Sequence, residues 1–231
     1  NLSACNLAHT LYTSGSTGLP KGVMGTHQMT VNRLTWLDKR LPVNDDDVFC
    51  LKTSIVFVDH VAEIFQPLIN ARPLAIMPPD KLKSSIELIQ ELNAQKVTRL
   101  TLVPSLLKNM ISTGAILPHI QWIFCSGEEL LSSALTGFET TLPKASLYNV
   151  YGSTEVSADV TFYAVERENI AQTAEQTSLP IGQLLQNAQA WILDDNLTLV
   201  PYGTPGNLFI GGQCLARGYH GQASMTADRF I

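Results

Sequence analysis

The stretch LYTSGSTGLPKGV, residues 11–23, decides how this chain is interpreted. An apolar lead-in is followed by hydroxyl side chains and glycines, and the run closes on Lys21 and Gly22. Glycine permits backbone dihedrals that turn N–H groups toward one point, hydroxyls add donors, and lysine supplies positive charge, so such a loop can bind phosphate oxygens. A Walker loop needs Ser or Thr directly after its lysine, which this run lacks. A Ser/Gly-rich run can also be a flexible connector.

The composition limits the class of protein. The chain has 231 residues, of which 45% are hydrophobic and 15% are charged, enough for one sizeable domain or two small ones. The net charge is −5 and no basic run occurs, so we expect no nucleic-acid partner. No apolar stretch approaches the ~20 residues of a membrane span, and no signal-peptide pattern is recognisable. We therefore expect no membrane partner and a cytoplasmic location.

Short apolar runs alternate with helical patterns between residues 50 and 160. This rhythm predicts an α/β fold with a parallel sheet. The predicted strands are 73–77, 97–103, 120–125 and 145–150. The predicted helices cover 84–94, a short segment opened by Ser105, and 128–138, the last with two acids in its first turn.

The texture changes after about residue 180. Two apolar runs flank the turn at 194–196, which predicts a β-hairpin over 191–200, and a further strand follows at 207–210. We therefore expect an α/β part at 1–180 and a β-rich subdomain at 181–231.

Two loops carry chemistry at the strand ends, where ligands of such sheets bind. The first is 125–128, where a glycine would let a flat ring approach the backbone. The second is 148–155, in which Tyr151 could stack on a base, Thr154 could bond phosphate and Glu155 could hold magnesium. Taken alone, the second loop is equally consistent with a surface turn beside a core tyrosine.

Three segments resemble the motifs of adenylate-forming enzymes. Residues 11–23 resemble the phosphate loop in the form used by adenylation domains of nonribosomal peptide synthetases. NVYGSTE, residues 149–155, resembles the NxYGxTE motif, and residues 205–219 resemble the later GELxIxGxGVARGY motif. The resemblance covers the chain almost end to end. It implies part of the large N-terminal domain of an enzyme that joins a carboxylate to AMP, releases pyrophosphate and passes the acyl group to a thiol.

The resemblance also implies roles for residues that match the motifs. The implied catalytic residues are Lys21, Thr154 and Glu155, with Glu155 as the Mg²⁺ ligand. The implied ATP-binding residues are Thr13, Ser14, Gly15, Ser16, Thr17, Gly18, Lys21, Gly127, Asn149, Tyr151, Gly152 and Thr154. The implied acceptor is the phosphopantetheine thiol of a peptidyl carrier protein, expected within the same parent chain.

The chain departs from the family's pattern in several places. Ser153, Asn207 and Cys214 replace a proline, a glutamate and a glycine. No YxTGD motif occurs, so the resemblance places the ribose-binding aspartate, and the mobile C-terminal domain with its catalytic lysine, beyond Ile231. The fragment alone is therefore expected to be inactive.

Residues 54–65 resemble the pocket segment of amino-acid-activating domains. There an aspartate directly follows the phenylalanine and pairs with the substrate's α-ammonium group, whereas here Val58 follows and Asp59 comes one residue later. An apolar contact cannot compensate an ammonium ion, so the shift predicts an amine displaced along the substrate. The implied pocket residues are Val58, Asp59, Ala62, Thr101, Phe124, Ser126, Val150, Ala158 and Asp159.

This pocket pattern is similar to that of domains activating β-alanine, which predicts a small amino acid that carries a β-amine. Three alternatives stay open. Asp59 can be a solvated capping acid, with the alignment slipped by one residue. The protein can be an acyl-CoA ligase for an amine-free carboxylic acid, or the fragment can be a non-catalytic nucleotide-binding module.

Overall fold

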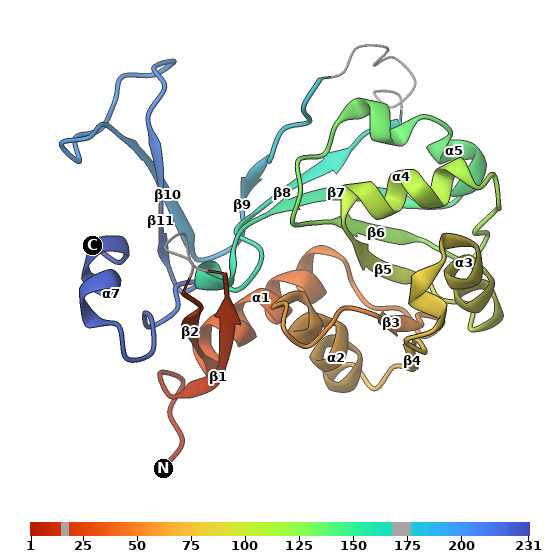
Figure 1. Cartoon of the computed structure of the whole chain (residues 1–231), viewed down its shortest axis with the longest axis horizontal. Helices are drawn as coiled ribbons and strands as arrows, with labels where there is room; N and C mark the ends of the chain where they lie inside the picture. Colours follow the sequence, from red (N-terminus) through yellow and green to blue (C-terminus); the bar gives the residue numbers. More distant parts are fainter. Residues whose placement is uncertain (15–18, 168–176) are drawn as a thin grey trace.

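The computed structural model describes residues 1–14, 19–167 and 177–231. The phosphate-loop residues Gly15, Ser16, Thr17 and Gly18 lie outside the described residues. Figure 1 shows a large α/β body that carries the central sheet, and beside it a smaller group made of β1, β2, β10, β11 and α7. These two groups meet around α1 and the end of β7.

The central sheet has five strands in the described part of the chain, in the order β5-β6-β7-β8-β9. The strands are β5 (Arg99–Leu102), β6 (Trp122–Cys125), β7 (Ser146–Tyr151), β8 (Thr161–Val165) and β9 (Gln183–Leu184). β5, β6 and β7 run parallel, whereas β8 and β9 are each antiparallel to the strand before them. This arrangement confirms the predicted α/β class, and β5, β6 and β7 match three predicted strands.

Helices cover both faces of this sheet (Figure 1). Alternate strand residues point to opposite faces, so Ile123 and Cys125 join the core under α3 and α4, while Phe124 joins the core under α1 and α2. The predicted helix at 84–94 is confirmed, because Leu88, Ile89 and Leu92 form its buried stripe. The helices are α1 (His27–Arg40), α2 (Asp59–Ile69), α3 (Ser85–Ala94) and α4 (Pro104–Ser112).

A short parallel pair lies within the large α/β body, close to β5 (Figure 1). It consists of β3 (Phe49–Leu51) and β4 (Leu74–Ile76), the second of which was predicted at 73–77. A turn of 3₁₀ helix, η1 (Lys81–Lys83), leads from β4 to α3.

The prediction of one helix over 128–138 is wrong. The structure has a 3₁₀ turn, η2 (Ser132–Leu135), and a short helix, α5 (Phe138–Thr141), separated by Gly137 at φ 88°. A left-handed glycine interrupts a helix because its dihedrals cannot continue the hydrogen-bond ladder.

The first acid of that segment, Glu128, contacts another helix. The Glu128 carboxylate accepts hydrogen bonds from the backbone N–H and the hydroxyl of Ser105, both at 2.9 Å. Ser105 lies in the first turn of α4, where unpaired N–H groups favour a negative charge.

An antiparallel hairpin begins the chain and meets its C-terminal part. β1 (Leu7–Thr13) pairs with β2 (Lys21–Thr26), and the segment 217–220 joins the free edge of β2. The bonds include Met24 N–H to the Gly218 carbonyl at 2.9 Å. The two parts of the chain thus build one structural unit around Lys21.

The predicted hairpin over 191–200 is only partly correct. The turn forms, with Leu197 N–H bonded to the Asp194 carbonyl at 3.0 Å, but the strand after it is reduced to a single bridge. The ladder partner of β10 (Ala188–Leu193) is β11 (Asn207–Gly212), the strand predicted at 207–210. A helix, α7 (Ala223–Arg229), follows. A boundary near residue 180 remains a prediction.

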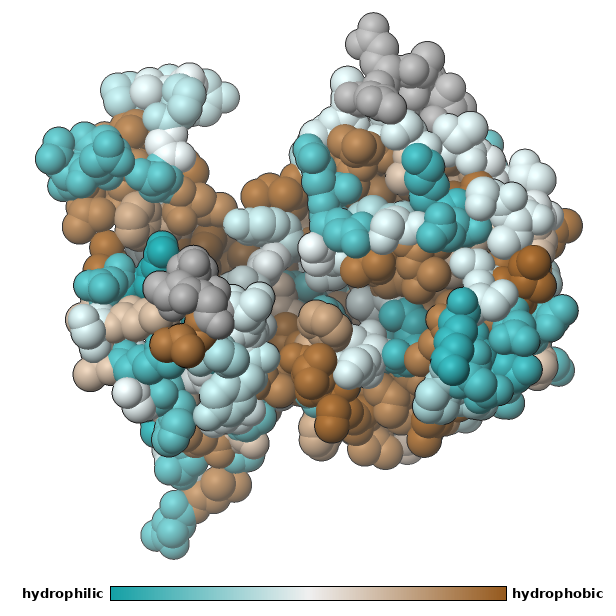
Figure 2. All heavy atoms as spheres, viewed as in Figure 1, coloured by the Kyte–Doolittle hydropathy of each residue, from teal (hydrophilic) through white to brown (hydrophobic). Residues whose placement is uncertain are grey.

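Apolar side chains are exposed along α2 and the turn before it. Figure 2 shows this as brown surface in the lower middle of the molecule, where Figure 1 places α2. The exposed residues there are Ile55, Val56, Phe57, Phe65, Leu68 and Ile69. Among the described residues, no helix is both long enough and apolar enough to cross a membrane.

Candidate functional site

Lys21 and Glu155 form the first part of the site. Lys21 begins β2, and Glu155 lies in the 3₁₀ turn η3 (Thr154–Val156) directly after β7. The Lys21 Nζ lies 2.6 Å from the Glu155 Oε1, although 134 residues separate them in the chain. The lysine of the first motif and the carboxylate of the second therefore meet in space.

Tyr219 completes this cluster. Its hydroxyl donates to the same Glu155 oxygen at 2.8 Å and accepts from Lys21 at 3.2 Å. The Lys21 ammonium also lies 4.8 Å from the centre of the Tyr219 ring. We call Lys21, Glu155 and Tyr219 the phosphate-side cluster.

The ionised forms are favoured in this cluster. Burial opposes the charge of Lys21, but its bonds to Glu155 and Tyr219 outweigh burial and raise the pKa of Lys21 above its ordinary value. Burial likewise acts against the charge of Glu155, and the bonds from Lys21 and Tyr219 outweigh it, so the pKa of Glu155 is lowered. Burial and the neighbouring Glu155 carboxylate raise the pKa of Tyr219. At neutral pH the pair is a lysine cation and a carboxylate.

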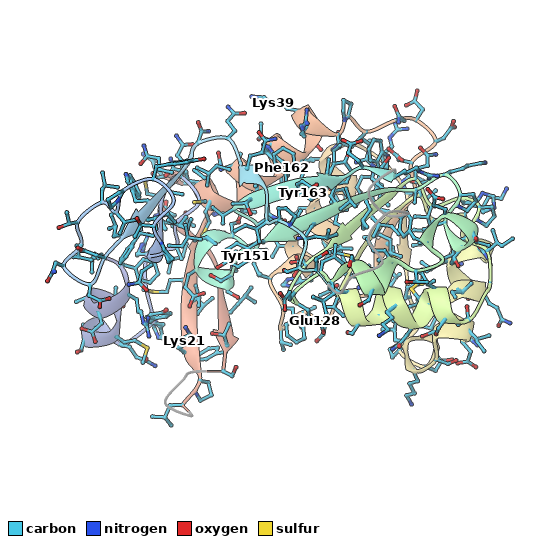
Figure 3. All side chains as sticks on the ribbon, turned by 90° about the horizontal axis from the view of Figure 1, so that it is seen from above. Lys21, Lys39, Glu128, Tyr151, Phe162 and Tyr163 are labelled. Carbon is cyan, nitrogen blue, oxygen red and sulfur yellow. The ribbon has the colours of Figure 1, made fainter. Side chains whose placement is uncertain are left out.

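The other predicted nucleotide residues surround the end of β7. Tyr151 is the last residue of β7 and is 43% exposed. Thr154 opens η3, next to Glu155. Figure 3 shows Tyr151 at the end of the central sheet nearest the hairpin that carries Lys21.

Two of the predicted nucleotide residues have structural roles that the sequence did not reveal. The buried Asn149 side chain donates to the Pro180 carbonyl at 2.9 Å and ties β7 to the segment before β9. Gly152 is required by close approach, because a Cβ there would lie 2.0 Å from the Ala158 carbonyl oxygen. Gly127 adopts φ 85°, in the left-handed region that favours glycine.

Two further predicted residues end β1. Thr13 is half-buried, and its hydroxyl has no hydrogen-bond partner among the described residues. Ser14 is exposed. Both directly precede residues 15–18, which lie outside the described residues.

A small cavity of about 30 Å³ lies between the sheet and helices α1 and α2. Five predicted pocket residues line it, which are Ala62, Thr101, Phe124, Val150 and Asp159. The strands place them together, since Thr101 and Phe124 are register partners on β5 and β6 and Val150 is near the end of β7. The structure therefore gathers on one face residues that the sequence spreads over 98 positions.

The other four predicted pocket residues do not line this cavity. Val58 is buried as the N-cap of α2, and Ala158 is buried beside Asp159. Ser126 is buried directly after β6, with its N–H bonded to the Leu102 carbonyl at 3.1 Å. Asp59 is the first residue of α2, where the helix dipole favours a carboxylate.

Arg33 joins the two pocket aspartates. Its guanidinium lies 2.6 Å from Asp159 Oδ2 and 3.1 Å from Asp59 Oδ1. The side chains of Arg33 and Asp159 are only 6% and 4% exposed, and that of Asp59 is 20% exposed. We call Arg33, Asp59 and Asp159 the pocket cluster.

Two polar atoms of the pocket cluster remain unpaired. Arg33 Nη1 and Asp159 Oδ1 are buried and have no hydrogen-bond partner among the described residues. Burial raises the pKa of Asp159 to about 6, against the effect of Arg33, and the nearby Asp59 carboxylate adds to the rise. An unpaired buried carboxylate oxygen is an acceptor that a donor from outside can satisfy.

The backbone around Asp159 is specialised. Ser157 and Ala158 both have left-handed dihedrals, with φ of 66° and 73°. Such dihedrals cost energy for residues other than glycine and cluster at functional sites. The strained pair turns the chain back so that the Asp159 side chain reaches Arg33.

Sequence reasoning missed three residues of the site, namely Arg33, Glu63 and Tyr219. Arg33 lies on α1 among the buried residues Met29, Leu34 and Leu37, so a charge on an apolar helix face was the available signal. Glu63 is buried and accepts from the N–H groups of residues 52 and 53, which fixes the chain entering the pocket segment. Tyr219 fell within a matched motif, but the motif indicated no role for its hydroxyl.

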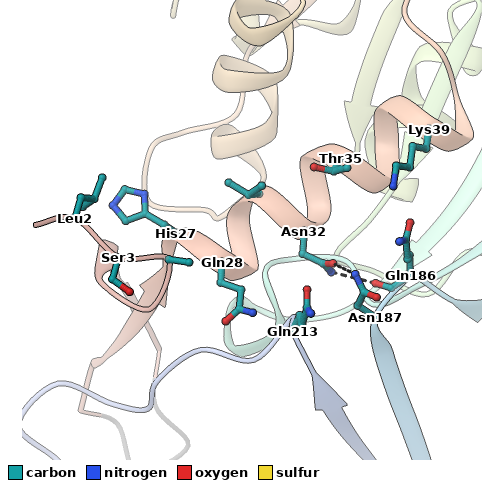
Figure 4. A pocket seen from close by; sticks show the side chains of 12 residues that line it. Leu2, Ser3, His27, Gln28, Asn32, Thr35, Lys39, Gln186, Asn187 and Gln213 are labelled. Atoms are coloured by element: carbon teal, nitrogen blue, oxygen red, sulfur yellow. Dashed lines mark hydrogen bonds between the residues drawn. The ribbon is translucent and has the colours of Figure 1, made fainter.

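A separate hollow of about 480 Å³ lies on the other side of α1 (Figure 4). It is lined by polar side chains that include His27, Asn32 and Gln213, and Asn187 donates to Asn32 there at 2.9 Å. None of the predicted site residues lines it.

Comparison with known proteins decides the family. The AMP-binding enzyme family matches residues 1–220. The chain belongs to this family. Vanchrobactin synthetase VabF from Vibrio anguillarum is 39% identical over 238 residues, a match that covers 100% of this chain and 8% of VabF. Phosphinothricin tripeptide synthetase PhsB from Streptomyces viridochromogenes is 38% identical over 228 residues, covering 97% of this chain and 18% of PhsB.

Solved structures agree with this assignment. The N-terminal subdomain of Klebsiella oxytoca NpsA, in complex with 3-hydroxybenzoyl-AMSN, superposes with a TM-score of 0.85 at 29% identity. The match covers 100% of this chain and 57% of that subdomain. The resemblance to synthetase adenylation domains is thereby confirmed, and the chain spans less than a fifth of each of the two synthetases described above.

Proposed function

We propose that this AMP-binding chain carries much of a site that activates an amino acid with ATP as its aminoacyl-AMP. One observation carries the proposal, which is the meeting of Lys21 and Glu155 at 2.6 Å, with Glu155 four residues after the 43% exposed Tyr151 in the chain. A lysine cation, a carboxylate and an aromatic face match the needs of the phosphates, their metal and the adenine. Val150, which lines the cavity beside β7, directly precedes Tyr151 in the strand.

The reaction would be an in-line attack of a substrate carboxylate oxygen on the α-phosphorus, with pyrophosphate leaving. It needs no side-chain nucleophile, because its catalysis depends on positioning and on neutralising phosphate charge. Lys21 would donate to phosphate oxygens once it leaves Glu155, and the Thr154 hydroxyl would donate to the α-phosphate. Tyr151 would stack on adenine.

Glu155 is the residue that would hold Mg²⁺. Among the described residues, no three acidic, histidine or cysteine side chains gather into a metal site. A single carboxylate fits Mg²⁺, since this ion keeps several waters and takes its other ligands from substrate phosphates. Bound there, Mg²⁺ would neutralise charge that develops on the leaving pyrophosphate.

The proposed substrate is a small amino acid with its amine in the β-position, such as β-alanine. The ammonium would bind between Asp59 and the unpaired Oδ1 of Asp159. Val58, at the position one residue earlier, is buried and has no charge to offer an α-amine. Phe124 and Val150 line the cavity and would narrow it toward a small substrate.

The acceptor would be the phosphopantetheine thiol of a carrier protein. Support comes from the relatives, since this chain matches 8% and 18% of two long synthetases. A carrier domain in the same parent chain would receive the acyl group without release of the adenylate.

The test is ATP–pyrophosphate exchange by the full-length protein that contains this chain. The acids compared are β-alanine, α-alanine, propionate and 3-hydroxybenzoate, the last chosen because NpsA is bound to its acyl group. Exchange with β-alanine that falls at least about tenfold in Asp59→Asn supports the proposal. Asp45→Asn is the matched control, because the Asp45 side chain is 95% exposed and pairs with Arg72. Exchange confined to amine-free acids would contradict the proposal of an amino-acid substrate. Absence of exchange with every acid would contradict the proposed adenylating activity.

A further inference from the structure

The charges around Arg33 in the pocket do not cancel. The pocket cluster holds one guanidinium and two carboxylates. The other charges that line the cavity are internally balanced. Arg99 pairs with Asp47 at 2.9 Å, and Glu63 faces Lys52 at 3.8 Å. The pocket cluster is therefore left with a net charge of −1 in a site from which water is largely excluded.

The geometry shows where the surplus charge lies. Both bonds of Arg33 to Asp159 use Oδ2, which leaves Oδ1 buried and unpaired. Asp59 Oδ1 accepts from the Arg33 Nη2, the same nitrogen that contacts Asp159 Oδ2. A charged group in a buried site is costly unless it is paired, so an uncompensated carboxylate oxygen is a place for one cation. The unpaired Nη1 of Arg33 would at the same time repel a second ammonium group.

We propose that Arg33 is a specificity-determining residue, which offsets one of the two pocket carboxylates so that the pocket accepts a substrate with a single ammonium group. The inference rests on the proposed function, and it adds a residue outside the pocket positions that the family resemblance supplied. Without Arg33 the pocket would hold two uncompensated carboxylates. With Arg33 present and Asp159 absent, the pocket would be neutral and would not favour a substrate with an amine over one without.

The test is a charge series in the full-length protein, measured by ATP–pyrophosphate exchange with β-alanine and with propionate. These acids differ only by the ammonium group, so the ratio of their kcat/KM values measures the preference for an amine. The series comprises the unchanged protein, Asp159→Asn, the double variant Arg33→Gln with Asp159→Asn, and Arg33→Lys. In the same order, the net charges of the pocket cluster are −1, 0, −1 and −1.

We expect the ratio to fall at least about tenfold in Asp159→Asn and to recover to within about threefold of the original in the double variant. Recovery is the decisive readout, because a purely structural role of Arg33 would make the double variant worse than the single one. Arg33→Lys keeps the charge and should keep the ratio. A matched surface series at the Arg72–Asp45 pair should leave the ratio unchanged.

The outcomes separate the inference from the function on which it rests. If the unchanged protein prefers β-alanine and the folded double variant does not recover, the role of Arg33 is wrong. A folded Arg33→Lys that loses the preference as fully as Asp159→Asn also contradicts it, and this variant decides the matter if the double variant does not fold. If the unchanged protein shows no preference for the amine, the proposed substrate itself is wrong.

Discussion

The two charged clusters of this molecule differ in burial and in the use that burial allows. The phosphate-side cluster joins Lys21 and Glu155, whose side chains are 22% and 21% exposed. The pocket cluster joins Arg33 and Asp159, whose side chains are 6% and 4% exposed. Both contain bonds of 2.6 Å between segments more than 120 residues apart in the chain.

Ion pairs of the same length carry different energies in the two clusters. A partly exposed ion pair is weaker than a buried one, and pairs at the surface contribute about 0–1 kcal/mol, because water competes for both partners. A ligand with phosphate groups and a metal can therefore separate Lys21 from Glu155 at little cost. A buried pair is costly to break, so Arg33 and Asp159 form a fixed part of the pocket. The first cluster is suited to exchange of partners and the second to selection of a substrate.

The largest effect is expected from breaking the buried cluster. Arg33→Met should lower the free energy of unfolding by about 3–5 kcal/mol, because it leaves two carboxylates in the pocket without their cation. Lys21→Met should lower it by about 1 kcal/mol or less. Urea unfolding of the full-length protein, followed by a probe of this domain, measures both. Equal losses in the two variants would contradict the distinction between the clusters.

The next effect concerns activity. Lys21→Ala should lower kcat for ATP–pyrophosphate exchange about 10²- to 10³-fold, the usual loss when one donor to the developing phosphate charge is removed. Lys39→Ala is the matched control, since Lys39 is an exposed lysine on α1 that lines the separate hollow. An unchanged kcat in Lys21→Ala would remove Lys21 from the catalytic machinery.

The pocket cluster should also make substrate binding depend on pH. The pKa of Asp159 is raised to about 6 by burial, and the ionised carboxylate is the form that binds an ammonium group. As pH falls through about 6 Asp159 gains a proton, so KM for β-alanine should rise by up to tenfold per pH unit. The KM for propionate should lack this rise. A KM for β-alanine that is flat between pH 5 and pH 7 would contradict the role of Asp159.

The smallest effect should come from Tyr219. Tyr219→Phe removes the donor at 2.8 Å from Glu155 and the acceptor of Lys21, at a cost of about 0.5–1.5 kcal/mol. Because the hydroxyl helps to hold the pKa of Glu155 low, that pKa should rise in the variant. The readouts are the unfolding free energy and the low-pH limb of the exchange rate, which should move to higher pH. A larger loss of stability in Tyr219→Phe than in Arg33→Met would contradict the claim that the pocket cluster stabilises the fold more than the phosphate-side cluster.

Local pattern was enough to predict much of the fold. The stripe of α3 and the apolar runs of β5, β6 and β7 are periodic, and periodicity reflects which face is buried. The segment 128–138 was wrongly predicted as a helix because an acid such as Glu128 is typical of a helix's own first turn. The Glu128 carboxylate instead accepts from the first turn of α4, which lies beside it in space. The partner of β10 was misassigned because the ladder skips the nearer strand and uses β11.

The site, like the fold, could be predicted from the sequence only in part. The motifs located Lys21 and Glu155 separately, and the parallel sheet explains why Phe124 and Val150 reach one pocket. Arg33 was not predicted, because its partners lie 26 and 126 positions away and no local pattern records a bond across that distance. Its signal was a single charge on the apolar face of α1.

The most direct test of the account compares β-alanine and propionate in ATP–pyrophosphate exchange by the full-length protein, before and after Asp59→Asn. We predict exchange that prefers β-alanine, with a preference that falls at least about tenfold in Asp59→Asn while exchange with propionate is unchanged. Equal use of both acids by the unchanged protein would contradict the claim that the buried cluster selects an amine. The phosphate-side cluster would then stand alone as the site of an amine-free acid ligase.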